Sequence, residues 1–367
     1  MRLTLPVIDN DELNEIREVL DSGYLTQGAK VAKFENLVSE LVGSQFAFAT
    51  SSCTTALHLA LVALGIGPGD EVAVADFSFP ATANVVVQTG AKPVMVDIEL
   101  ETYTIDINDL KAKLTSKTKV IIVVHTFGCS ADMDPINQIA QQNGIAVIED
   151  AACAIGTTYY GRFVGGLGTM GCFSFHPRKV ITTAEGGMIT TNDAELADHI
   201  RVLRNHGGVK EKHWYVYNEA GFNYRLSDVH GAIGVAQMAK LPILIEKRRL
   251  LAARLRERLV DLPKIKLPKE PAWGGHIYQS FVVLVDKDLD RDRVIDNLRA
   301  QDIESVLGTY ALHAQPFYCE NYGYTPGELK NSFLAYRQSL TLPLFPQMTE
   351  TDLDTIARGF KKALAEA

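Results

Sequence analysis

From residue 46 onward, short apolar runs alternate with longer segments whose apolar positions recur at helical spacing. The short runs predict strands at residues 46–50, 71–75, 92–97, 119–125 and 145–150. The longer segments predict helices at residues 54–65, 81–90, 106–114 and 134–144. Strands that alternate with helices of this length indicate βαβ units and a mainly parallel sheet.

The pattern changes after about residue 240. Residues 241–262 read as a long, charged amphipathic helix, and Pro-containing segments then lead to a strand at 280–286 and a helix at 290–301. A chain of 367 residues is also long for a single core. We therefore expect a large α/β domain over 1–240, which includes the N-terminal segment, and a smaller α+β domain over 241–367.

Composition excludes several kinds of protein. The net charge of −8 offers no basic excess to neutralise phosphates, which argues against a general nucleic-acid binder. The five cysteines form no CxxC pair, so neither a disulfide framework nor a metal site is predicted. The N-terminus lacks the apolar core of a signal peptide, and no run of about 18 apolar residues occurs. A cytoplasmic protein without a membrane partner is expected.

The stretch "FSFHPRKVITTAEGG" at 173–187 draws attention to Lys179. Two further strands, at 171–175 and 187–191, are predicted around it. A lone lysine at the end of a strand is usually a surface residue. The alternative is a Schiff-base lysine, which requires partner residues elsewhere in the chain.

Four features supply such partners, because ligands of open α/β sheets bind at the carboxyl ends of the strands. Asp150 ends the run "VIED" and could pair with the pyridine nitrogen of pyridoxal phosphate (PLP), although it could also cap a helix. "ATSSCTTALHL" opens a helix whose free N–H groups suit a phosphate, and Ser174 could add a hydroxyl. Phe79 follows a strand where an aromatic ring could cover a flat cofactor, or simply pack in the core.

The order of these features, ending in Ser-x4-Lys, is typical of fold-type I PLP enzymes. The chain resembles the DegT/StrS family of PLP-dependent nucleotide-sugar aminotransferases over nearly its whole length. The resemblance is carried by "SGYLTQGAKVAKFE", "TTALHLALVALGIGPGDEV", "GAKPVMVDI", "VIEDAA", "FSFHPRK", "EGGMITTND", "GFNYRLSD" and "LTLPLFP". It implies a mainly parallel sheet of the seven-stranded type with a smaller C-terminal α+β domain.

The resemblance also implies roles for individual residues. Lys179 would carry the cofactor as a Schiff base, and Asp150 would pair with its ring nitrogen. The residues that match the family's phosphate contacts are Thr54, Thr55 and Ser174, together with Asn223, which would reach the phosphate from the neighbouring subunit. Phe79 matches the residue that stacks on the ring. His313 and Tyr310 match residues near the sugar nucleotide. A homodimer with shared active sites follows. For His313 a structural role is the alternative.

Three residues depart from the family pattern. Cys153 stands where the family usually has Gln or His near the cofactor ring. Cys53 replaces a Gly of the phosphate turn, so its side chain would lie where a backbone normally approaches phosphate. Ala184 replaces the first Gly of Gly-Glu-Gly-Gly, and we expect that this position does not need a positive φ.

The resulting interpretation is amino transfer from L-glutamate to a nucleotide-linked keto-sugar. "ITTAEGGMITTND" is similar to the loop of C4-aminating relatives such as perosamine synthases, which favours C4 of a 4-keto-6-deoxyhexose. The alternatives are a C3-aminating enzyme, a PLP-dependent sugar dehydratase and a non-catalytic regulatory protein. The dehydratases carry His in place of the lysine, so Lys179 argues against that alternative.

Overall fold

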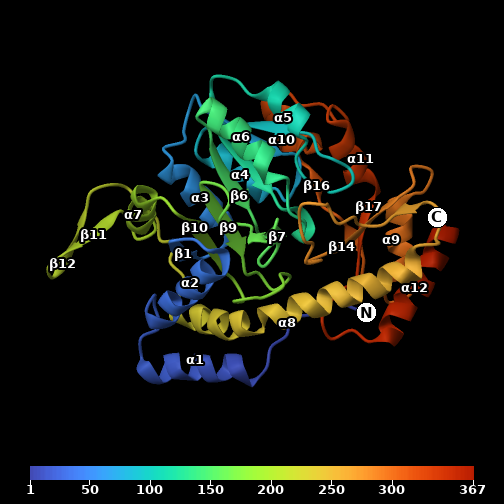
Figure 1. Cartoon of the computed structure of the whole chain (residues 1–367), viewed down its shortest axis with the longest axis horizontal. Helices are drawn as coiled ribbons and strands as arrows, with labels where there is room; N and C mark the ends of the chain where they lie inside the picture. The colour runs from blue at the N-terminus through green and yellow to red at the C-terminus, as the bar shows by residue number, and fades with distance from the viewer.

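A seven-stranded sheet forms the centre of the chain in the computed structural model, which describes all 367 residues (Figure 1). Its strands lie in the order β1 (Phe46–Thr50), β10 (Gly187–Thr191), β9 (Met170–Ser174), β6 (Ala146–Asp150), β5 (Thr118–Val124), β2 (Glu71–Ala75) and β4 (Lys92–Val96). All pairs are parallel except those that β10 makes with β1 and β9. The expected fold-type I architecture and all seven strands predicted here are confirmed.

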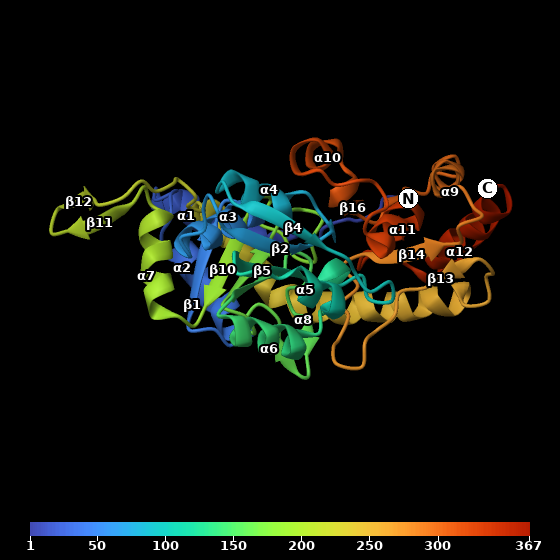
Figure 2. The ribbon, with the colours of Figure 1, turned by 90° about the horizontal axis from the view of Figure 1, so that it is seen from above.

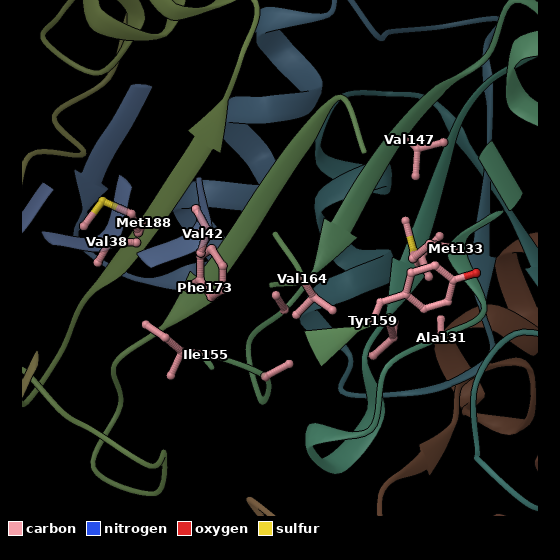
Figure 3. Packing of buried hydrophobic residues seen from close by; sticks show 14 of the residues in the cluster. Val38, Val42, Ala131, Met133, Val147, Ile155, Tyr159, Val164, Phe173 and Met188 are labelled. Carbon is pink, nitrogen blue, oxygen red and sulfur yellow. The ribbon is translucent and has the colours of Figure 1, made fainter. Parts of the chain in front are cut away.

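Alternate side chains of each strand enter separate cores on the two faces of the sheet. In β6, for example, Val147 belongs to one buried cluster and Ile148 to the other. Figure 3 shows the first cluster, in which Val38 and Val42 of α2 (Ala29–Val42) meet Phe173 of β9 and Met188 of β10. Because both faces are covered, the strands are continuous apolar runs, which explains why the sequence revealed them clearly.

Helices cover both faces of this sheet. The predicted helices appear as α3 (Cys53–Ala63), α4 (Ala81–Gln88), α5 (Ile107–Lys113) and α6 (Met133–Asn143). Helices α1 (Asn10–Ser22), α2 (Ala29–Val42) and α7 (Ala194–Leu203) were not predicted. In both views α1 and α2 lie beside the first part of the long helix α8 (Figures 1 and 2).

Helix α8 (Asp228–Leu259) connects the large sheet to the C-terminal part of the chain. It begins at Asp228, after the N-cap Ser227, rather than near Leu241 as the sequence predicted. Pro242 lies inside it, where proline normally disfavours a helix. Residue 240 therefore falls within one continuous helix, and the division of the chain into 1–240 and 241–367 stays a prediction.

A second, antiparallel sheet organises the C-terminal part. It contains β13 (Ile265–Lys266), β14 (Phe281–Val285), β17 (Ser339–Leu342) and β15 (Val306–Leu307), in that order. The helices of this part are α9 (Arg291–Arg299), α10 (Pro316–Tyr322), α11 (Lys330–Gln338) and α12 (Glu350–Ala365). The N-terminal residues reach this part too, since the Leu344 N–H donates to the Leu3 carbonyl at 3.3 Å.

Short pairings complete the structure. β3 (Phe77–Ser78) pairs with β16 (Tyr310–Ala311) and joins the two parts, and β7 (Thr158–Tyr159) pairs with β8 (Arg162–Phe163). The remaining short helices are the 3-10 turns η1 (Thr126–Gly128) and η2 (Leu312–Ala314). A hairpin of β11 (Gly208–Glu211) and β12 (Trp214–Tyr217) projects away from the body in both views (Figures 1 and 2). None of the helices combines the length and apolar character needed to cross a bilayer.

Candidate active site

A cavity of about 500 Å³ lies at the carboxyl ends of the parallel strands. Seven of the residues singled out from the sequence line it: Cys53, Thr54, Phe79, Asp150, Cys153, Ser174 and Lys179. The opposite wall comes from the small sheet and its loops, including Gln279, Thr309 and Thr341. The cavity is therefore built by both parts of the chain, and its volume is in the range of ligand sites.

The turn after β9 presents Lys179 to this cavity. The Lys179 N–H donates to the His176 carbonyl at 2.8 Å, and the Thr183 N–H donates to the Phe175 carbonyl at 2.9 Å, so the turn is closed on itself. The Lys179 amine Nζ donates to Cys153 Sγ at 3.1 Å. Burial lowers the pKa of Lys179, but the neighbouring Cys153, Cys53 and Asp150 raise it more strongly, so the net shift is upward.

Asp150 is a buried carboxylate that forms no salt bridge. It ends β6, and its side chain is only 5% exposed. Oδ2 accepts a hydrogen bond from Thr82 Oγ1 at 2.8 Å and Oδ1 accepts one from the Ala152 N–H at 3.2 Å. Burial raises the Asp150 pKa despite these two donors and the attraction of Lys179. A cationic ring N–H beside Asp150 would favour the charged carboxylate and offset this burial.

The start of α3 offers donors for an anion. Ser52 caps the helix by accepting from the Thr55 N–H, and the Cys53 and Thr54 N–H groups find no acceptor within the protein. Unpaired N–H groups and the helix dipole together suit a phosphate. Thr55 does not line the cavity, because its hydroxyl closes the capping box with the Ser52 N–H at 3.0 Å.

Gly187 allows β10 to pass close to this turn. A Cβ at position 187 would lie 2.3 Å from the Ser52 carbonyl oxygen and 2.6 Å from the Cys53 nitrogen. Any side chain there would push the start of α3 away from its place. The glycine after Glu185-Gly186 is thus required by the close approach of backbone to backbone.

These features fit PLP. An amine, a buried carboxylate, free helix N–H groups and the Ser174 hydroxyl open into one cavity. Phe79, 65% exposed on the cavity wall, has a free aromatic face to offer a planar ring. The site thus holds each kind of group that the cofactor needs, in one place.

The structure shows the conformation of two of the three residues that depart from the family pattern, Cys53 and Ala184. The Cys53 side chain is turned into the core beneath α3, where it is 8% exposed. Burial, with the nearby Asp150 as a second cause, raises the pKa of the Cys53 thiol well above its usual value, so it brings no negative charge to the phosphate turn. Ala184 contradicts our expectation, because its φ of 68° lies in the left-handed region.

Replacing Ala184 with glycine is expected to stabilise the protein by about 0.5–1 kcal/mol. The left-handed conformation costs an alanine about 1–2 kcal/mol, of which the greater freedom of an unfolded glycine offsets about 0.4–1 kcal/mol. The exposed Ala253 within α8 is the matched control, since Ala253→Gly should destabilise by about 1 kcal/mol. Urea unfolding midpoints at a fixed PLP concentration measure both. If both variants lose stability, residue 184 does not hold a positive φ in solution.

His313 and Tyr310 do not contact the cavity. His313 is fully buried: Nδ1 lies 2.6 Å from Asp76 Oδ2, and Nε2 accepts from the Gly327 N–H at 3.3 Å. Tyr310 pairs with Ser78 through β16 and β3. Both residues join the C-terminal part to the end of β2. Their assignment to a sugar-nucleotide site stays a prediction, with a structural role as the alternative for His313.

Asn223 is exposed and lies outside the cavity of its own chain. The backbone of its segment runs past the phosphate turn, where the Ser51 N–H donates to the Tyr224 carbonyl at 3.0 Å. The assignment of Asn223 to a neighbouring subunit's site stays a prediction.

The sequence analysis did not single out several cavity residues, among them Thr82, His125 and Gln279. Thr82, the second residue of α4, orients Asp150, and His125 follows directly after β5. His125 could have been found by the rule that located Asp150, since both lie at strand ends. The Gln279 side chain donates from Nε2 to the Arg178 carbonyl at 2.8 Å and so links the two walls of the cavity. Because the two residues are 101 positions apart, the sequence around Gln279 gives no sign of this contact.

Comparison with known proteins agrees with this geometry. Residues 6–361 match the DegT/DnrJ/EryC1/StrS aminotransferase family. The spore coat polysaccharide biosynthesis protein SpsC of Bacillus subtilis is 38% identical over 371 residues, which cover 98% of this chain and 95% of SpsC.

Two solved structures superpose over the entire chain. The PLP form of Spr1654 from Streptococcus pneumoniae has a TM-score of 0.95 at 26% identity and is covered over 99% of its length. PseC of Helicobacter pylori, an aminotransferase involved in the biosynthesis of pseudoaminic acid, has a TM-score of 0.94 at 26% identity and is also covered over 99%. The chain therefore belongs to the DegT/DnrJ/EryC1/StrS family and is a PLP-dependent sugar aminotransferase.

Proposed function

We propose that this enzyme transfers an amino group from L-glutamate to C4 of a nucleotide-linked 4-keto-6-deoxyhexose. The observation that carries the proposal is the position of the Lys179 amine inside a cavity that also holds Asp150 and the start of α3. The small-sheet wall and the N-terminal residues Leu3 and Thr4 enclose further space beyond these groups. That space is where a sugar would be received.

The bound cofactor acts as an electron sink for the bonds broken at the donor α-carbon. Asp150 would hold the protonated ring nitrogen, which keeps that sink effective. The Cys53 and Thr54 N–H groups, with the Thr54 and Ser174 hydroxyls, would bind the phosphate, while Phe79 would cover the ring. Each of these groups lines the cavity.

Lys179 would also move the protons. Its amine would take the proton from the donor α-carbon and, in the second half of the cycle, deliver a proton to the former carbonyl carbon of the sugar. Arg178 is the only other lysine or arginine that lines the cavity. It is suited to bind a carboxylate of the donor, which supports an anionic amino acid such as glutamate.

The choice of C4 rests on the loop that follows Lys179. In the structure Thr182 and Thr183 are buried and bond to the backbone of Phe175 and Glu185, at 2.8 and 2.7 Å. Glu185 is the residue of this loop that reaches the cavity. The two threonines therefore support the loop, and Glu185 is placed to contact the sugar.

Offering matched 3-keto and 4-keto sugars on the same nucleotide tests the proposal. We expect faster turnover of the 4-keto compound by about 10²-fold or more, because the wrong regioisomer leaves buried polar groups unpaired. NMR of the product locates the new nitrogen, and glutamate is compared with aspartate and alanine as donor. Preferred amination at C3 would overturn the regiochemistry, and a preferred donor other than glutamate would overturn that assignment.

We further infer that the enzyme is a homodimer with shared active sites. The β11–β12 hairpin exposes Trp214 and Tyr217, by 65% and 63%, at a distance from the body (Figure 2). An isolated two-stranded hairpin is at best marginally stable in water. A second copy of the chain that covers these rings, and places Asn223 beside its neighbour's phosphate site, would explain both features.

A further inference from the structure

We propose that Cys153 and Lys179 form an oxidative modification site, in which a hydroperoxide joins the thiol sulfur to the lysine amine. The starting observation is the 3.1 Å distance between Lys179 Nζ and Cys153 Sγ. The lysine side chain therefore already contacts the sulfur through its donor nitrogen.

Cys153 is the thiol best placed for this reaction. It is half-buried and lines the cavity, so a small oxidant can reach it. Three other cysteines, Cys53, Cys129 and Cys172, are buried, and burial raises the pKa of each thiol, which disfavours the reactive thiolate. Cys319 lies outside the cavity, with its Sγ donating to the His313 carbonyl at 3.2 Å.

The chemistry has two balanced steps. Hydrogen peroxide oxidises the thiol to a sulfenic acid, and one water is released. Lys179 first loses a proton to solvent, and the resulting neutral amine attacks the sulfur. An S–N bond forms, the S–O bond breaks, and the hydroxyl leaves as a second water with a further proton from the amine. One peroxide is reduced and the sulfur is oxidised by two electrons. An added dithiol reverses the sequence by attacking the sulfur and releasing the amine.

The consequence rests on the proposed role of Lys179. A lysine held in an S–N bond cannot attach the cofactor or move a proton, so the enzyme would be inactive until reduced. Conversely, a lysine already bound to PLP has no free amine to offer. The cross-link is thus restricted to protein whose Lys179 amine is free, and it would protect Cys153 from irreversible oxidation in that state.

Peptide mapping of full-length, cofactor-free protein treated with hydrogen peroxide tests the proposal. We expect one linked pair of peptides, containing Cys153 and Lys179, whose mass is about 2 Da below the sum of the two, since two hydrogens are lost. Dithiothreitol should restore both peptides. Protein loaded with PLP before oxidation should give at least about tenfold less of the linked pair.

Variants separate this chemistry from ordinary oxidation. Cys153→Gln, the residue type usual in the family, should give no linked pair, and Cys319→Ser should give as much as the parent. In Lys179→Met, which lacks the amine, Cys153 should instead trap dimedone as a sulfenic acid. The proposal is overturned if oxidised parent protein carries sulfinic acid or a disulfide at Cys153 with a free Lys179, or if Cys153 is not oxidised. Borohydride mapping of PLP tests the role of Lys179 separately.

Discussion

Replacing Lys179 with alanine is expected to lower the rate of amino transfer by at least about 10⁴-fold, because the variant loses both the cofactor attachment and the general base. The fold should survive. The lysine side chain is half-buried, and its amine makes a single hydrogen bond, with Cys153 Sγ. Removing one such contact costs about 1 kcal/mol, a small part of the stability of a domain.

The measurements are a coupled assay for 2-oxoglutarate and circular dichroism of the same preparations. Lys361→Ala is the matched control, because Lys361 is an exposed lysine on α12 and its loss should leave the rate within about twofold. Borohydride reduction of the parent enzyme, followed by peptide mapping, should find the cofactor on Lys179 alone. Attachment to another lysine, or a variant that keeps more than about 1% of the activity, would contradict the assignment.

The parts of this fold that were predictable are those governed by local physics. Strands buried on both faces must be largely apolar, so the apolar runs of β5 and β6 stand out from their surroundings. Their carboxyl ends then locate the site, which is why Asp150 and Lys179 were found without a structure. The start of α8 was missed because Pro242 normally marks the beginning of a helix, whereas here packing against α1 and α2 maintains the helix on both sides of it.

The features that could not be predicted depend on contacts between distant parts of the chain. His313 is held by Asp76, 237 positions away, so its sequence context gives no sign that both ring nitrogens are already engaged. The φ of Ala184 is likewise set by the surrounding turn, in which its N–H donates to Thr182 Oγ1 at 2.9 Å. A residue that avoids the left-handed region when free can be held there by such a network.

The second large effect concerns the sharing of active sites between subunits. Asn223 is exposed and absent from its own cavity, and the nearby hairpin leaves aromatic side chains uncovered. If Asn223 binds the partner's phosphate, Asn223→Asp should be severely impaired, because a second negative charge would face the phosphate. Each single variant, Lys179→Ala or Asn223→Asp, would then be nearly inactive by itself.

Mixing the two variants under conditions that exchange subunits should restore activity to about a quarter of that of the parent enzyme. Half of the dimers would be mixed, and each mixed dimer would hold one site with both an intact Lys179 and an intact Asn223. Sites contained within one subunit would remain inactive in every dimer. Activity is measured before and after exchange, with the fraction of mixed dimers determined by native mass spectrometry.

The double variant Lys179→Ala/Asn223→Asp, mixed in equal amounts with parent enzyme, gives the opposite result and serves as the matched control. With shared sites, one site of each mixed dimer would combine the intact Lys179 with the altered position 223. The other site would combine the intact Asn223 with the altered position 179, so both sites would be inactive. Activity should therefore fall from about half to about a quarter of that of the undiluted parent as subunits exchange. With unshared sites it would stay at about half. A mixture of demonstrated heterodimers that neither gains activity in the first experiment nor loses it in the second places each active site within a single chain.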